Sequence, residues 1–137
     1  MSKKREVERT KDEYVMYIII NDNVKMSKGK VASQACHSSC YVTRILERQR
    51  SKEHMYNQWL KEGEPKILLK ATEKEMLDII HQYEVDNRVK RSSEFTWCVY
   101  VRDSGRTEIQ SNTLTSIAFK PISKANAPRE LLRLRLL

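Results

Sequence analysis

The polar residues best suited to chemistry gather in two short segments. The first, Lys25-Met26-Ser27-Lys28-Gly29-Lys30, lies where a predicted strand gives way to a predicted helix. Backbone N–H groups at a helix start favour anions, and lysines add formal charge, so an RNA phosphate or a developing oxyanion would fit beside Lys25, Lys28 and Lys30. An ordinary solvated surface is the alternative. The segment lacks the earlier glycine of a P-loop and has Val31 where a P-loop has Ser or Thr.

The second segment is Asp103-Ser104-Gly105-Arg106-Thr107, directly after a predicted buried strand. Open α/β sheets bind ligands at the carboxyl ends of their strands. A carboxylate at Asp103 can orient or deprotonate a water there, and the hydroxyl of Thr107 can hold a substrate hydroxyl or carbonyl. A plain Asp-Ser-Gly turn is the alternative interpretation. The sequence contains no Gly-x-Ser-x-Gly motif, so a serine-triad hydrolase is not expected.

The first predicted helix carries polar residues on one face. Lys30, Gln34 and Ser38 recur every four residues, which aligns them along the helix. His37 lies on a neighbouring stripe, where it is either a packed residue with one hydrogen bond or a catalytic one. This helix therefore presents Lys30 and Gln34 in the same direction.

The cysteines do not predict a metal site. The spacing of Cys36, His37 and Cys40 resembles one, but a structural zinc needs four ligands and Cys98 stands alone on a predicted strand. No cysteine occupies an evident nucleophile turn. We expect neither metal binding nor thiol catalysis.

The elements that must position these residues alternate between strands and helices. Apolar and β-branched runs predict strands at 14–20, 66–71, 95–101 and 113–119. Helical spacing and capping residues predict helices at about 28–49, a brief one near 55–60 that ends at Gly63, one from the Thr72–Glu75 capping box to Tyr83, and a short one near 123–132. Residues 86–94 are expected to form a loop and 134–137 an extended tail.

This order predicts an α/β fold: a single domain with a mixed, mostly parallel sheet of about four strands and helices on both faces. The strand at 14–20 has no polar alternation, which is typical of a central strand covered on both sides. Residues 1–13 carry mixed charges and only Met1 and Val7 as apolar side chains, so we expect a flexible charged tail ahead of a domain at 14–137.

Length and composition exclude several classes of protein. The 137 residues suffice for one domain with one core, and 39% apolar against 32% charged residues argues against a wholly disordered chain. The longest apolar run, 15–20, is far shorter than the roughly 20 residues that cross a bilayer. Three cysteines without an N-terminal apolar segment indicate a reducing compartment, so we expect a cytoplasmic protein with no membrane partner.

The charge points to a polyanionic partner. The net charge is +8: residues 25–50 carry +5, residues 120–137 carry +4, and the rest of the chain sums to −1. An excess of Lys and Arg can be a solubility device, but clustering favours a binding face. The first of these two clusters contains Lys30.

Taken together, the segments resemble the second type of peptidyl-tRNA hydrolase, the form typical of archaea and eukaryotes. Residues 25–34 are similar to the family's K-M-G-K-G-K-x-A-x-Q, and His37 follows them. Residues 63–66 are similar to its G-Q-P-K, and residues 103–109 to its D-A-G-R-T-Q-I. Thr115 in a final strand and the closing Leu-Arg-Leu-Leu resemble the family's end, L-K-L-L. The resemblance covers residues 14–137.

The resemblance implies hydrolysis of the ester that links a peptide to the 3′-terminal ribose of tRNA, with no metal or organic cofactor. It transfers catalytic roles to Lys30, Asp103 and Thr107. In this hypothesis Asp103 orients or activates a water, Thr107 positions the water or the ester, and Lys30 stabilises negative charge on the carbonyl oxygen. Substrate-binding or supporting roles are predicted for Lys25, Lys28, Gln34, His37, Arg106 and Thr115.

The sequence departs from the family pattern without losing a proposed catalytic side chain. Asn21 and Asn23 stand where the family usually has Arg and Asp, Ser27 replaces a Gly, and Glu64 and Glu108 replace Gln. A catalytically weakened tRNA- or protein-binding module of the same fold is therefore the alternative function. An interaction protein that uses the sheet edge is a third, and a homodimer is also left open.

Overall fold

The computed structural model describes residues 12–49, 54–84, 97–104, 109, 110 and 112–137. The strands are β1 (Tyr14–Asn21), β2 (Lys66–Ala71), β3 (Cys98–Arg102), β4 (Leu114–Phe119), β5 (Ile122–Ser123) and β6 (Arg135–Leu136). The helices are α2 (Lys28–Arg48), α3 (His54–Lys61), α4 (Glu73–Ile79), the π-helical turn η1 (Ile80–Glu84), the 3₁₀ turn η2 (Lys124–Asn126) and α6 (Arg129–Leu132). Among the described helices, none is long and apolar enough to cross a membrane.

The strands form one mixed sheet in the order β3-β4-β1-β2-β6, with β5 paired to β1. The α/β domain with a mixed sheet is confirmed, but the prediction of a mostly parallel sheet of about four strands is wrong. Only β1 and β2 pair in parallel, and the other described pairings are antiparallel. The connection from β3 to β4 is too short for the helical crossover that parallel neighbours need. β5 and β6 have two residues each, too few for a periodic signal.

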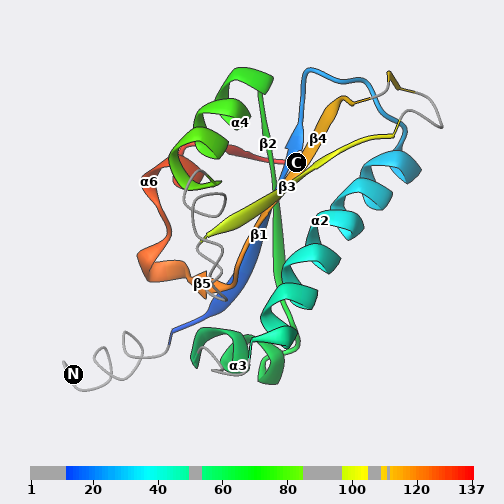
Figure 1. Cartoon of the computed structure of the whole chain (residues 1–137). Coiled ribbons are helices and arrows are strands. Elements are labelled where there is room, and N and C mark those ends of the chain that lie inside the picture. The colour runs from blue at the N-terminus through cyan, green and yellow to red at the C-terminus, as the bar shows by residue number, and fades with distance from the viewer. Residues whose placement is uncertain (1–11, 50–53, 85–96, 105–108, 111) are drawn as a thin grey trace.

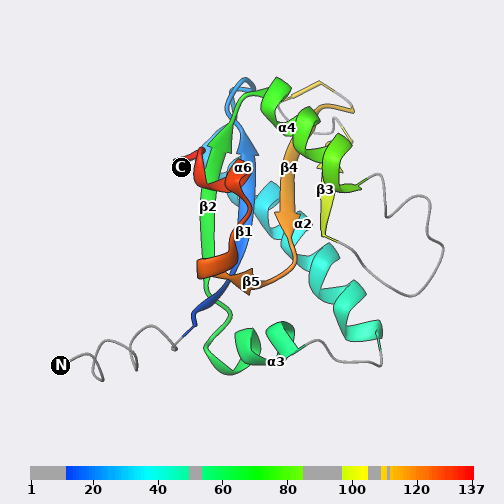
Figure 2. The same cartoon turned by 90° about the vertical axis from the view of Figure 1, so that its left-hand side faces the viewer.

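β1 is the central strand, and its side chains supply two cores. Val15, Tyr17 and Ile19 pack on the side of α4 and α6, whereas the alternate residues Met16 and Ile18 pack on the side of α2 and α3. Figure 1 shows the sheet edge-on between these helices, and Figure 2 shows the same layers after a quarter turn. The prediction of helices on both faces is confirmed.

Local capping sets the helix starts. The Ser27 side chain accepts a hydrogen bond from the Lys30 N–H at the start of α2, and Thr72 and Glu75 form the predicted capping box of α4. α4 gives way to η1 at Ile80, so the α-helix is shorter than predicted. Gly63, with φ of +95°, follows α3 in the left-handed region that favours glycine.

The chain after β4 differs from its prediction. Instead of one helix near 123–132 there are two short pieces, η2 and α6, because Pro128 has no N–H to continue the first and instead precedes the second. The extended tail pairs with β2 as β6. The predicted loop at 86–94, the start of the predicted strand at 95, and residues 1–11 of the predicted tail lie outside the described residues.

Tyr83 and Glu130 join η1 to α6. The Tyr83 hydroxyl donates to Glu130 Oε1 over 2.8 Å. Burial, followed by this hydrogen bond, raises the pKa of Tyr83 to about 12, and the same bond is the main cause of a lowered pKa of Glu130. The contact lies on the face of the sheet that α4 and α6 cover, where it joins η1 to α6.

Candidate active site

A buried ion pair joins the two segments that the sequence singles out. Lys30 lies in the first turn of α2 and Asp103 directly follows β3, and Lys30 Nζ is 2.7 Å from Asp103 Oδ1. The two side chains are only 8% and 6% exposed. Charged side chains are rarely buried to this extent unless they are paired. The fold thus brings the two segments together at Lys30 and Asp103.

Backbone hydrogen bonds fix Asp103 at the mouth of the β3–β4 connection. Its N–H donates to the Thr113 carbonyl over 2.8 Å, and its carbonyl accepts from the Asn112 N–H over 2.6 Å. The strand register shifts between Val101 and Arg102, immediately before it. Irregularities of this kind re-aim side chains at strand ends. These two backbone hydrogen bonds hold Asp103 so that its carboxylate faces Lys30 on α2.

Gln34 links the ion pair to the centre of the sheet. Its Nε2 donates to Asp103 Oδ1 over 3.3 Å, and its Oε1 accepts from the Thr115 hydroxyl. The carboxylate of Asp103 is an acceptor, so the amide nitrogen must face it and the amide oxygen must face Thr115. Gln34 and Thr115 are 2% and 0% exposed. With their four-residue spacing on α2, Lys30 and Gln34 both face the Asp103 carboxylate.

Two asparagines that sequence reasoning left unassigned tie the neighbouring strand ends together. Asn21, buried at the end of β1, donates from Nδ2 to the Leu114 carbonyl over 2.9 Å and to Glu73 Oε1 over 3.1 Å. Asn23 Oδ1 accepts from the Glu73 N–H over 2.7 Å. The available signal was the Asn-Asp-Asn sequence after an apolar strand, since such side chains often bond nearby backbone. Asn21 thereby holds the start of β4, next to Thr115, and Asn23 holds the start of α4.

Comparison with known proteins agrees with this geometry. The family model described as "Peptidyl-tRNA hydrolase PTH2" matches residues 14–137. This chain belongs to the peptidyl-tRNA hydrolase PTH2 family. Its matching region contains β1, α2 and the Lys30–Asp103 pair. The resemblance inferred from the motifs is confirmed.

Archaeal members of the PTH2 family resemble the chain along most of its length, and each carries the name peptidyl-tRNA hydrolase. The protein of Methanococcus maripaludis strain S2 is 34% identical over 125 residues, which cover 87% of this chain and 99% of the relative. The Methanocaldococcus jannaschii protein is 32% identical over 107 residues, 77% of this chain and 84% of the relative. The Sulfurisphaera tokodaii protein is 34% identical over 120 residues, which cover 85% of this chain and 88% of the relative.

Other predicted site residues of this PTH2 protein are placed apart from the ion pair or are not described. Lys25, Lys28 and His37 are exposed. Ser38 is fully buried, and its hydroxyl lies 3.2 Å from the Ala35 carbonyl of its own helix, which indicates a structural role. Arg106 and Thr107 lie outside the described residues, so their predicted roles stay predictions.

The three cysteines of this PTH2 protein lie on α2 and β3. Cys36 and Cys40 are exposed on α2 and Cys98 is buried on β3. Across the described part of the chain, no three His, Cys, Asp or Glu side chains gather closely enough to hold a metal ion.

Proposed function

We propose that this chain hydrolyses the ester bond between the peptide and the 3′-terminal ribose of peptidyl-tRNA, which releases free tRNA for reuse in translation. The observation that carries the proposal is the buried Lys30–Asp103 pair, braced by Gln34, in a chain of the PTH2 family. A base and a cation at one point meet the two needs of ester hydrolysis, which are an activated water and a stabilised oxyanion.

Asp103 acts on the water. The water oxygen attacks the ester carbonyl carbon while its proton passes to the carboxylate, and a tetrahedral oxyanion forms. The bond from that carbon to the ribose 3′ oxygen then breaks, and the 3′ oxygen takes up the proton. A positioned base of this kind contributes about 10²- to 10⁴-fold to the rate.

Lys30 stabilises the oxyanion. An ammonium carries three N–H bonds, so Lys30 can hold Asp103 and contact a carbonyl oxygen at the same time. A preorganised donor inside a nearly dry site needs little rearrangement as negative charge develops, and losing such a donor costs about 10²- to 10³-fold. Thr107 is assigned the positioning of the water or the ester.

Gln34 and Thr115 are positioning residues. Gln34 donates to the same oxygen of Asp103 as Lys30 does, so it restricts rotation of the carboxylate. Thr115 holds the Gln34 amide from the other side. The exposed Lys25 and Lys28 at the start of α2, together with Arg106, are assigned to phosphates near the tRNA 3′ end.

The direct test is cleavage of peptidyl-tRNA labelled in its peptide, by protein treated with a chelator. Wild-type protein is expected to release free tRNA, whereas Asp103→Asn is expected to release it at least about 100-fold more slowly. Asp78→Asn is the matched control, because Asp78 is an exposed carboxylate on α4, on the other side of the sheet from α2. Strongly salt-dependent tRNA binding with no hydrolysis would instead support the binding-module alternative.

Cytoplasmic localisation is part of the proposal, and the exposed free thiols of Cys36 and Cys40 support a reducing compartment. A homodimer stays a prediction that sedimentation equilibrium would test.

A further inference from the structure

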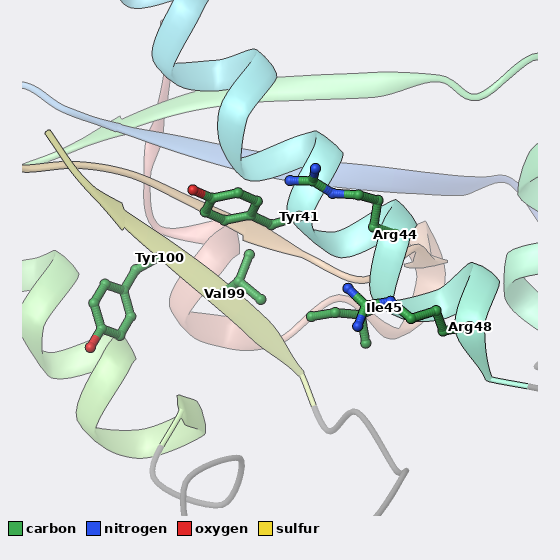
Figure 3. Close-up of a pocket in the computed structure, with 6 residues that line it drawn as sticks. All are labelled: Tyr41, Arg44, Ile45, Arg48, Val99 and Tyr100. Atoms are coloured by element: carbon green, nitrogen blue, oxygen red, sulfur yellow. The ribbon is translucent and has the colours of Figure 1, made fainter. Parts of the chain in front are cut away.

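A basic groove follows the second half of α2. It has a volume of about 560 Å³, is open to solvent, and lies between α2 and β3, which forms one end of the strand order. Its lining residues are Tyr41, Arg44, Ile45, Arg48, Val99 and Tyr100 (Figure 3). Figure 3 shows the Tyr100 ring directed to the far side of β3 from Tyr41, so Tyr100 borders the groove by its backbone. Ile45 and Val99 supply aliphatic surface to the groove, and its charged residues, Arg44 and Arg48, come from α2.

The groove and the active site lie along one seam. The residues of α2 that face β3 and β4 are spaced three or four apart: Lys30, Gln34, Ser38, Tyr41, Ile45 and Arg48. At 1.5 Å per residue, Tyr41 lies about 16 Å along the helix from Lys30. At about 3.3 Å per residue, Val99 lies about 13 Å along the strand direction from Asp103. Because Gln34 and Ser38 are buried, the open groove begins at Tyr41, and a strand that reached both sites would pass over the surface between them.

The charges of the groove are not balanced by the described carboxylates. Arg44 and Arg48 are exposed and four residues apart, an arrangement that repulsion disfavours on a helix. Neither forms a salt bridge with a described residue. The single acidic residue of α2, Glu47, instead accepts a hydrogen bond from the Tyr56 hydroxyl over 2.6 Å. An external anion would relieve the repulsion between the two arginines.

The groove offers a ring as well as cations. Tyr41 is 42% exposed, and the guanidinium carbon of Arg44 lies 5.2 Å from the centre of its ring. Guanidinium groups bind phosphates through paired hydrogen bonds, and exposed aromatic rings stack on unpaired bases. Phosphate and base together are the chemistry of a single-stranded polynucleotide. An acidic peptide would use the arginines without requiring the ring.

We propose that this α2–β3 groove binds the 3′-terminal strand of the tRNA around the junction of its unpaired end with the acceptor stem, with Arg44 and Arg48 on backbone phosphates and Tyr41 against a base. Stacked nucleotides advance about 3.4 Å each, so Tyr41, about 16 Å from Lys30, corresponds to about five nucleotides upstream of the ester, and Arg48, about 27 Å from Lys30, to about eight. The groove therefore extends from that junction toward the stem. This inference rests on the proposed function, because it requires the ester to lie at Lys30 and Asp103.

The test compares a long and a short substrate. Peptidyl-tRNA spans the groove, whereas an N-blocked aminoacyl ester of adenosine reaches only the active site. Arg44→Gln combined with Arg48→Gln is expected to lower kcat/KM for peptidyl-tRNA by about 10- to 100-fold, mainly through KM. The dependence of log KM on log salt should weaken by about 1.4, or about 0.7 for each phosphate contact on a single strand. No such loss is expected with the adenosine ester.

The matched control is Arg129→Gln combined with Arg133→Gln. These arginines are also exposed and four residues apart, and the variant changes the net charge equally, but they lie on or next to α6 on the other side of the sheet. Tyr41 is tested by Tyr41→Leu, which should raise KM for peptidyl-tRNA by about 5- to 150-fold, and by Tyr41→Phe, which keeps the ring and should not.

The two failures are distinguishable. If wild-type protein cleaves neither substrate, the proposed function is wrong. If wild-type protein cleaves both substrates, two results would show that the groove does not bind the tRNA end. One is a kcat/KM for peptidyl-tRNA that is the same in the Arg44 and Arg48 double variant and the α6 control. The other is an equal loss of kcat/KM on both substrates in the Arg44 and Arg48 double variant. An unchanged salt dependence would overturn the phosphate contacts specifically.

Discussion

The Lys30–Asp103 pair predicts that one substitution will damage stability and catalysis by separate routes. Asp103→Asn removes a negative charge from a site where both side chains are less than a tenth exposed. Leaving a buried charge without its counter-ion costs about 3–5 kcal/mol. The new amide oxygen can still accept a hydrogen bond from Lys30, so we expect about 3 kcal/mol. A domain of this length has roughly 7–20 kcal/mol of stability, so the variant should remain folded at 25 °C.

A second substitution separates the two effects. In the double variant Lys30→Met with Asp103→Asn, neither charge remains, and replacing a buried ion pair by groups of similar size is often neutral. The free energy of unfolding, measured in urea, should return to within about 1 kcal/mol of wild type. Hydrolysis of peptidyl-tRNA should stay at least about 100-fold below wild type in both variants, with tRNA binding little changed in the single one.

Two results would refute this reasoning. If the double variant is as unstable as Asp103→Asn alone, the loss does not arise from an unpaired Lys30. If the double variant hydrolyses peptidyl-tRNA near the wild-type rate, neither side chain takes part in the chemistry. Circular dichroism of each variant before the assay would show that the fold is intact.

Three further predictions concern the surroundings of the pair. Thr115→Val should lower kcat and should destabilise the fold by about 1–3 kcal/mol, because it leaves the buried Gln34 carbonyl without its donor. Thr115→Ser keeps the hydroxyl, so it should be close to wild type in urea unfolding and in turnover. Asn21→Leu should cost a similar amount in urea unfolding, because the Leu114 carbonyl loses its donor. Tyr83→Phe should destabilise at neutral pH, where ionised Glu130 accepts the Tyr83 hydrogen bond, and the difference from wild type should shrink as pH falls through the lowered pKa of Glu130.

Each of these has a contradicting outcome. Equal kcat values for Thr115→Val and wild type would remove Thr115 from the positioning of the site. An Asn21→Leu protein with unchanged unfolding midpoint and slope would show that its hydrogen bonds contribute nothing net. Because the pKa of Glu130 is lowered in the folded protein, its stabilising effect is present above its ordinary pKa and is lost as the pH falls. If the stability difference between Tyr83→Phe and wild type stays constant from pH 7 to pH 3, the Tyr83 hydrogen bond is not the cause of the lowered pKa.

Local patterns predicted the elements well where the cause is local. The Thr72–Glu75 capping box, the Ser27 cap and the fully buried strand before Asn21 each depend on residues close in sequence, and the structure confirms all three. Pro128 was also visible, but its effect was underestimated. A helix was predicted across it, although a proline removes the N–H that the preceding turn needs.

Sheet order and the assembled site were harder because they depend on distant pairs. Lys30 and Asp103 are 73 positions apart, and no residue pattern in either segment predicts that β4 lies between β1 and β3. Periodicity indicates which residues are buried but not which strand they pair with, and the mostly parallel sheet was wrong for that reason. Asn21 and Asn23 were assigned no role because their partners, Leu114 and Glu73, are supplied by that same tertiary arrangement.

The central position of β1 also constrains when the protein can become active. Ile18 pairs with Leu68 on one side and with Ala118 on the other, so during synthesis β1 waits about 100 residues for its second neighbour. At about 5–20 residues per second that interval lasts roughly 5–20 s. Such long-range pairing slows folding, and β1 is apolar on both faces during the delay. Gln34 cannot meet Thr115 until β4 has been made, so the nascent chain has no complete site before these later residues are synthesised.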